Sequence, residues 1–208
     1  MRFLLSSLTI FLSLSGVAVA QTGWEVIQPR RDLTGWTRLA IPSGPVNPET
    51  QWKIEGDVLV CEGDKGHEWL RFDREFGDLV FHVEFRYTPR EGNPRYNSGI
   101  FIRNAADSHI WHQVQIGGAS GGYIFGDTLV GGEIKRINLQ KAMTEMRVKP
   151  AGEWNVVEVT AKGATISASV NGAVVSEFTQ CEFPRGYIGL EAEGYRIEFR
   201  NLKLKRLP

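Results

Sequence analysis

Apolar and polar residues alternate along much of this chain, and this alternation restricts its fold more than any other feature. From Phe81 to Tyr87 every second side chain is apolar, whereas the side chains between them are His82, Glu84 and Arg86. A period of two residues is typical of a β-strand with one face in the core and the other in solvent. The alternation therefore predicts a protein built mainly from strands.

Similar patterns and short apolar runs predict about a dozen strands in total. Besides 78–87, they are 51–54, 57–61, 68–72, 98–103, 112–116, 154–160, 164–170, 173–178, 187–192 and 195–207. The dipeptide Asn171-Gly172 predicts a type I′ hairpin turn, because both residues tolerate a positive φ. So many short strands are typical of a sandwich or barrel rather than of a single open sheet.

Two stretches depart from the strand pattern. Residues 40–50 (AIPSGPVNPET) are a predicted loop because of their Pro, Ser and Gly content. Residues 126–152 carry few strand signals, and within them only 138–146 has a helix-favouring composition. A connection of that length inside a compact domain is usually functional or mobile. No linker or repeat divides the chain after residue 20, so we expect residues 21–208 to form one all-β domain.

Composition narrows the possible functions. The 208 residues include 24 Lys and Arg against 24 Asp and Glu, so the formal net charge is zero. Nucleic-acid binding needs a basic surface, and this balance argues against it. The 23 Gly, 11 Phe and 6 Trp residues agree with short strands joined by tight turns.

The first twenty residues have the features of a secretory signal peptide. An apolar run follows Arg2 and reaches Ala18-Val19-Ala20, a small-x-small cleavage motif, before the next charge at Glu25. We therefore predict residues 1–20 to be a signal peptide cleaved after Ala20, and the mature protein to be periplasmic or secreted. The alternative is a membrane anchor, for which the run is short and rich in Ser. No later segment approaches a membrane span.

Two cysteines, Cys61 and Cys181, would remain after cleavage. An oxidising compartment permits a disulfide between them. The alternative is a pair of buried free thiols, because Cys also behaves as a small core hydrophobe. The sequence leaves both alternatives open.

Outward positions on the middle strands carry many hydrogen-bonding side chains. They are Glu84, Arg86, Arg103, Gln113 and Gln115. Such groups suit a polyhydroxylated ligand, because hydroxyl groups both donate and accept hydrogen bonds. Aromatic residues that could cover the apolar face of a sugar ring lie close by in the sequence: Phe101, Trp111, Tyr123 and Phe125. The alternative is that the polar residues are merely the solvated side of an antiparallel sheet.

His112 is a candidate general base, because the unperturbed pKa of histidine lies near neutral pH. The alternation places His112 on the same side as Val114 and Ile116, facing the core. His112 also begins its predicted strand, where the alternation is a weak guide, so a place at the rim of a groove is the alternative.

Nine short segments also carry a family resemblance. They are DLTGW (32–36), the W-x-I-x-G-x-x-L run from Trp52 to Leu59, FGDLVFHVEFR (76–86), NSGIFIR (97–103), QVQI (113–116), GEWN (152–155), VNG (170–172), YIGLEAEG (187–194) and IEFRNLKLKRL (197–207). Their content and order resemble the 3-keto-disaccharide hydrolase family over about residues 24–207. The resemblance implies a concanavalin A-like, jelly-roll β-sandwich of two antiparallel sheets, export from a bacterium, and a 3-keto glycoside as ligand.

The chemistry that the resemblance implies is an elimination. A ketone at C3 acidifies the C2 proton, a base removes that proton, and the glycosidic oxygen leaves from the enolate. Addition of water completes a net hydrolysis. We predict Glu193 or His112 as the base, Glu84 as a second carboxylate, and Arg103 with Arg86 beside the keto oxygen.

Ring hydroxyls would be held by Gln113 and Gln115, beside Trp111 and Tyr123. The chain departs from one branch of the family at two positions. That branch has Glu where this chain has Gln113, and His where it has Glu193. Glutamine cannot act as an acid or base, and a metal that needed the missing His would lose a ligand. A divalent metal therefore stays only a possible cofactor, with Glu84 and Glu193 as remaining ligands.

Two other functions remain open at this point. The same sandwich could be a glycan-binding module without activity, or a structural domain of the cell envelope. The sequence does not specify the glycan, the linkage or the oligomeric state.

Overall fold

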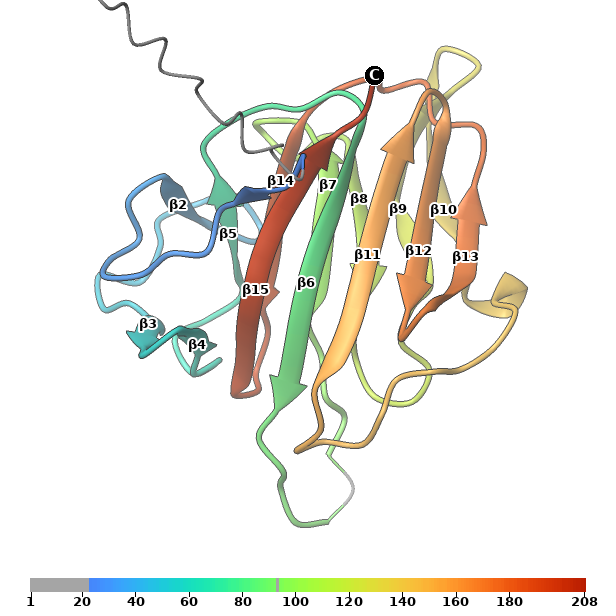
Figure 1. Ribbon diagram of the computed structural model, residues 1–208. Coiled ribbons are helices and arrows are strands. Elements are labelled where there is room, and N and C mark those ends of the chain that lie inside the picture. The colour runs from blue at the N-terminus through green and yellow to red at the C-terminus, as the bar shows by residue number, and fades with distance from the viewer. Residues whose placement is uncertain (1–22, 93) are drawn as a thin grey trace, which may run out of the picture.

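The computed structural model describes residues 23–92 and 94–208, so the predicted signal peptide, residues 1–20, lies outside the described residues. Two antiparallel sheets pack face to face in these ranges, as the all-β sandwich prediction requires (Figure 1). No helix in the described ranges is long and apolar enough to cross a membrane.

The eight-stranded sheet has the order β13-β12-β11-β6-β15-β4-β3, and β1 pairs with β15. Its strands are β1 (Glu25–Val26), β3 (Trp52–Glu55), β4 (Val58–Cys61), β6 (Leu79–Tyr87), β11 (Asn155–Lys162), β12 (Thr165–Val170), β13 (Ala173–Phe178) and β15 (Ile197–Arg206).

The seven-stranded sheet has the order β10-β9-β8-β7-β14-β5-β2. Its strands are β2 (Trp36–Ala40), β5 (Glu68–Phe72), β7 (Gly99–Asn104), β8 (Trp111–Gln115), β9 (Ile124–Val130), β10 (Glu133–Asn138) and β14 (Tyr187–Ala192). Strands that neighbour each other in a sheet are often far apart in the sequence: β6 lies between β11 and β15, and β14 lies between β5 and β7.

The core lies between the two sheets and is built from the alternating apolar positions. On β6, Phe81, Val83 and Phe85 are fully buried, and Ile100 and Val114 of the seven-stranded sheet belong to the same core. Burying one such side chain contributes about 1.5–3 kcal/mol. The period-two pattern therefore identified these inward-facing residues correctly.

The predicted turn at Asn171-Gly172 is confirmed, with φ values of 48° and 89°. The prediction for residues 126–152 is wrong, because β9 and β10 form a hairpin over much of this stretch. Strand β10 is exposed along nearly its whole length, so no alternation marks it. The helix-favouring stretch 138–146 contains only a 3₁₀ turn, η1 (Gln140–Ala142).

The cysteine alternatives are resolved in favour of two buried free thiols. Cys61 ends β4, near one edge of the eight-stranded sheet, whereas Cys181 follows β13 at the other edge. The width of the sheet separates the two residues, so no disulfide joins them.

Candidate functional site

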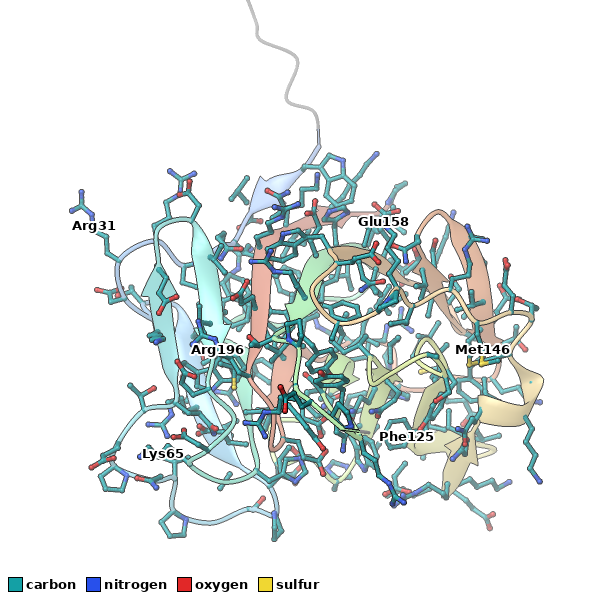
Figure 2. The ribbon with its side chains drawn as sticks, turned by 90° about the horizontal axis from the view of Figure 1, so that it is seen from below. Arg31, Lys65, Phe125, Met146, Glu158 and Arg196 are labelled. Atoms are coloured by element: carbon teal, nitrogen blue, oxygen red, sulfur yellow. The ribbon has the colours of Figure 1, made fainter. Side chains whose placement is uncertain are left out.

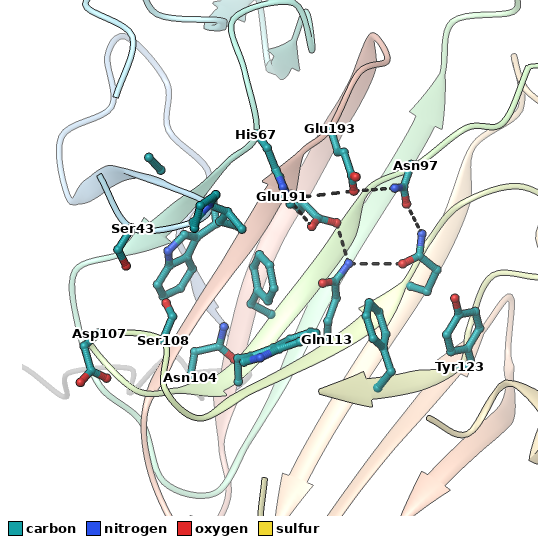
Figure 3. Close-up of a pocket in the computed structure, with 18 residues that line it drawn as sticks. Ser43, His67, Asn97, Asn104, Asp107, Ser108, Gln113, Tyr123, Glu191 and Glu193 are labelled. Atoms are coloured by element: carbon teal, nitrogen blue, oxygen red, sulfur yellow. Dashed lines mark hydrogen bonds and ion pairs between the residues drawn. The ribbon is translucent and has the colours of Figure 1, made fainter. Parts of the chain in front are cut away.

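A pocket of about 640 Å³ lies on the outer face of the seven-stranded sheet. Its floor comes from outward positions of β5, β7, β8 and β14, and its rim from the loops that follow β2 and β7. The volume is within the range of small-molecule sites, about 300–1,000 Å³. Figure 3 shows the lining side chains converging from these elements.

One wall of the pocket carries a histidine and two carboxylates. His67 Nε2 lies 2.8 Å from Glu191 Oε1 and 3.9 Å from Glu193 Oε2. Glu191 lies on β14 and is only 4% exposed, whereas His67 and Glu193 are partly open to the pocket. The ligand atoms of the three side chains all lie within 4.8 Å of one another. These are the described residues that could hold a metal ion.

A relay of three side-chain amides connects the two carboxylates (Figure 3). Gln113 Nε2 donates to Glu191 Oε2 at 2.6 Å and to Gln115 Oε1 at 3.3 Å. Gln115 then donates to Asn97, and Asn97 Nδ2 donates to Glu193 Oε2 at 2.5 Å. Gln113 donates both to Glu191 and into the relay, and the remaining amides donate onward toward Glu193, so both carboxylates are held as hydrogen-bond acceptors.

A glycine makes room for this relay. A Cβ atom added to Gly99 would lie 1.9 Å from Gln113 Nε2. The Gln113 side chain therefore crosses directly over the Gly99 backbone, and any larger residue at position 99 would displace it.

The pKa values follow from this geometry. The hydrogen bond with Glu191 raises the pKa of His67, against the opposing effect of burial. Burial, followed by the neighbouring Glu191 charge, raises the pKa of Glu193. The wall therefore favours a protonated imidazole beside Glu191.

Aromatic rings form the apolar part of the pocket. Trp69 meets Phe101 edge-on with ring centroids 5.4 Å apart, and Trp111 meets Phe125 at 5.1 Å. Trp111 Nε1 donates to Asp127 Oδ2 at 3.0 Å, which fixes the indole in place. Rings of this kind can cover the C–H face of a sugar while the amides contact its hydroxyls.

Five of the predicted site residues line this one pocket: Trp111, Gln113, Gln115, Tyr123 and Glu193. The structure brings them together from three different segments of the chain. Their roles toward a ligand stay predictions.

The prediction that Glu84 and Arg86 share this groove is wrong. Both point outward as expected, but β6 belongs to the eight-stranded sheet. Arg200 Nε donates to Glu84 Oε2 at 2.7 Å, and Arg86 Nη2 donates to Glu198 Oε2 at 2.5 Å. Figure 2 shows Glu158 of the eight-stranded sheet and Phe125 of the pocket on opposite sides of the molecule. A metal site that combines Glu84 with Glu193 is therefore excluded.

The prediction that Arg103 faces the ligand groove is also wrong. It is 1% exposed, donates to Asp78 Oδ1 at 2.7 Å, and does not line the pocket. Its φ of 50° turns the side chain away from the face that the alternation assigned to it. Arg103 therefore contributes a partly buried ion pair rather than a ligand contact.

His112 faces the core, as the alternation indicated, and the alternative rim position is wrong. It is fully buried, with Nε2 2.6 Å from Thr128 Oγ1 and Nδ1 3.2 Å from the Ile102 carbonyl. Burial lowers the pKa of His112 to about 4. Since it does not reach the pocket, it cannot take a proton from a ligand there.

Sequence reasoning missed His67, Glu191 and Asn97. Glu191 is two residues before Glu193 and therefore shares its side of the strand, which was a usable signal. His67 lies in the turn before β5, and Asn97 lies in the segment before β7. No local pattern connects those two positions with β14.

Comparison with solved structures identifies the fold class of the chain. A Parabacteroides distasonis protein assigned by inference as a glycosyl hydrolase matches with a TM-score of 0.64 and 19% identity, covering 89% of this chain and 94% of its own. The carbohydrate-binding module CBM66 from Bacillus subtilis matches with a TM-score of 0.61 and 14% identity, covering 82% and 95%. The Bacillus licheniformis β-glucanase matches with a TM-score of 0.55 and 14% identity, covering 90% and 100%. These likenesses show a jelly-roll β-sandwich.

This fold and the family profile together define a carbohydrate-active domain. The sequence profile of the 3-keto-alpha-glucoside-1,2-lyase-like domain matches residues 23–205, so the chain belongs to that family. No curated protein sequence matches the chain.

Proposed function

We propose that this protein cleaves 3-keto glycosides in the pocket on the seven-stranded sheet. The observation that carries the proposal is the convergence of two carboxylates, a histidine and three amides beside an aromatic floor. A neutral sugar offers hydroxyl groups for the amides and C–H faces for the rings. Family membership supplies the 3-keto group in the proposed substrate.

Glu193 is the proposed base. Its carboxylate is partly open to the pocket, and Asn97 fixes the orientation of one oxygen while the other remains available. A general base must lie within hydrogen-bond reach of the proton that it removes. The C3 ketone acidifies the C2 proton, which passes to Glu193. The electron pair of the broken C–H bond forms the enolate.

Collapse of the enolate breaks the bond between C1 and the glycosidic oxygen. That oxygen departs with the electron pair and takes up a proton from solvent, and Glu193 returns its proton to solvent, so the immediate products are an unsaturated keto sugar and a free alcohol. Addition of water across the new double bond gives the product of net hydrolysis. The scheme does not need the carboxylate pair of ordinary glycosidases.

A glycan-binding role without activity is the second candidate. The observation that favours it is the saturation of the relay: Gln113, Gln115 and Asn97 already bond to one another and to the carboxylates. Such a module would bind keto and ordinary sugars about equally well.

Export is a further part of the proposal. It rests on the apolar run before Ala20 and the cleavage motif there. Detection of the mature amino terminus at Gln21 in material secreted by a bacterial host would support it, and retention of residues 1–20 would contradict it.

The test is incubation of the purified protein with 3-keto disaccharides of several linkages, followed by measurement of free sugar. Replacing a general base typically lowers the rate by about 10²–10⁴-fold, so Glu193→Gln should lose at least a hundredfold in kcat. Glu198→Gln, on the opposite face, is the matched control and should keep the parent rate. Absence of turnover with every linkage, with divalent metals added, would refute the enzymatic proposal. Saturable binding in that case would support the binding module.

A further inference from the structure

Asn104 faces the pocket, although the alternation along β7 would turn it toward the core. Between the paired strands, the step from Tyr187 to Gly189 on β14 matches a longer step from Asn104 back to Phe101 on β7. The extra residue forms a β-bulge, which lies at Arg103, where φ is 50°. Asn104 therefore takes the outward place that Arg103 leaves, and it lines the pocket.

The backbone fixes the orientation of the Asn104 side-chain amide. The backbone N–H of His112 donates to Asn104 Oδ1 at 2.9 Å, so the amide oxygen must lie on that side. The amide nitrogen, Nδ2, lies at the other end of the group and donates to no acceptor among the described residues, although Asn104 is only 2% exposed. A nearly buried donor is costly to leave unpaired, so a ligand with an acceptor oxygen gains from meeting it.

The other three amides that line the pocket are already engaged. Gln113, Gln115 and Asn97 donate to one another and to the two carboxylates. Asn104 is therefore the one amide of the lining residues, all of which are described, that still offers its nitrogen to a ligand.

Asn104 lies at the end of the pocket that is remote from the carboxylates. Its partner on β14, Tyr187, lies four residues before Glu191, which corresponds to about 13 Å of strand. Figure 3 shows Asn104 near Ser108, on the far side of the pocket from Glu193. Asn104 is therefore out of reach of the sugar ring whose C2 proton passes to Glu193.

An aromatic ring borders the same end of the pocket. Trp111 directly precedes His112, whose N–H contacts Asn104, and its side chain lines the pocket. Asp127 accepts a hydrogen bond from the Trp111 indole at 3.0 Å and so holds the ring in place. A fixed apolar ring beside an unpaired donor suits a ligand that has both C–H faces and hydroxyl groups.

We propose that Asn104 is the specificity-determining donor of a second subsite, which binds the leaving group of the substrate through one of its hydroxyl oxygens. The assignment to the leaving group rests on the proposed function, whereas the hydrogen bond to a bound sugar does not. The subsite favours a leaving group that is itself a sugar or another polyol. A simple alcohol has no further hydroxyl group that could reach Asn104.

The variant Asn104→Asp separates binding from structure. It keeps an oxygen for the N–H of His112 but replaces the donor Nδ2 by an acceptor. We expect kcat/KM for a 3-keto disaccharide to fall about tenfold, and kcat/KM for a 3-keto methyl glycoside, which releases methanol, to stay at the parent value. Asn138→Asp is the matched control, because Asn138 Oδ1 accepts from the N–H of Gln140 at 3.0 Å outside the pocket. It should match the parent with both substrates.

A second measurement uses the parent protein alone and so does not depend on the folding of Asn104→Asp. Calorimetry compares an ordinary disaccharide, chosen from several linkages for its affinity, with analogues that each lack one hydroxyl group of the leaving-group sugar. At least one analogue should bind about tenfold more weakly than the complete disaccharide. A folded Asn104→Asp protein should bind that analogue and the complete disaccharide equally well.

The outcomes separate this inference from the proposed function. An equal loss of kcat/KM with both substrates, or no loss with either, in folded Asn104→Asp would overturn the second subsite and leave the proposed function intact. Unchanged affinity of the parent for every analogue would overturn the subsite too. Sugar binding that depends on Asn104, without turnover of any keto substrate, would support the subsite and count against the enzymatic proposal. Absence of both disaccharide binding and turnover would overturn both.

Discussion

The buried histidine in the core makes the stability of this protein depend on pH. His112 is fully buried between the sheets, and burial lowers its pKa from 6.5 to about 4. Below pH 6.5 the unfolded chain binds a proton at His112, whereas the folded protein stays neutral there until about pH 4. His112 therefore contributes stability that is fully present above pH 6.5 and is lost as the pH falls toward 4.

The magnitude follows from the separation of the two pKa values. One pKa unit corresponds to about 1.4 kcal/mol, so a difference of 2.5 units corresponds to about 3 kcal/mol of unfolding free energy. Most of that loss is complete at pH 4.5. It is a large part of the about 5–15 kcal/mol that stabilises an ordinary domain.

The assay is urea unfolding at pH 7.5 and pH 4.5 for the parent protein and for His112→Gln. The variant starts less stable at pH 7.5, because it loses contacts to Thr128 and a backbone carbonyl. The parent should then lose about 2–3 kcal/mol more than the variant between the two pH values. His109→Gln, at an exposed position, is the control and should keep the parent's pH dependence.

Equal pH dependence in the parent and His112→Gln would refute this reasoning. A direct NMR titration of the His112 ring in the parent protein gives an independent value. A midpoint near 6.5 in the folded state would likewise contradict the burial argument.

Three further predictions concern other positions. Arg103→Ala should cost about 2–3 kcal/mol of unfolding free energy, because it removes a buried side chain and its hydrogen bonds to Asp78 and to the Gly163 carbonyl; a loss below about 1 kcal/mol in urea unfolding would contradict this role of the buried guanidinium. Gly99→Ala should displace Gln113 and weaken sugar binding at least tenfold in calorimetry, with little change in Tm; unchanged affinity would show that Gln113 does not contact the ligand. A reducing agent should leave the Tm unchanged, because both cysteines are free thiols; a lower Tm would indicate a disulfide.

The strands could be predicted wherever one face is buried and the other is not. Strand β6 and the pairs from β11 to β13 show this clearly, and Asn171-Gly172 marked the turn between two of them. Strand β10 could not be found in this way, because it is an exposed edge strand without an apolar face. Local sequence patterns indicate which side chains are buried. An exposed edge strand that is held by its backbone hydrogen bonds shows no such pattern.

The site was only half predictable for a related reason. Alternation says which side of a strand a residue occupies, but it does not say which sheet the strand joins. Glu84 and Gln113 both point outward, yet they lie on opposite faces of the molecule because β6 and β8 belong to different sheets. Sheet membership is decided by pairing between distant segments, such as β14 with β5 and β7. The positive φ of Arg103 is a second feature of the structure that a period-two pattern cannot predict.

The same arrangement explains why an amide suits position 113. Gln113 donates to Glu191 at 2.6 Å, and an ionised glutamate in its place would bring two acceptors together. The relay continues through Gln115 and Asn97 to Glu193, so positions 113 and 193 belong to one hydrogen-bonded network. A change at either position alters the donors available at the other. Positions 113 and 193 are therefore coupled in how this pocket orients its carboxylates.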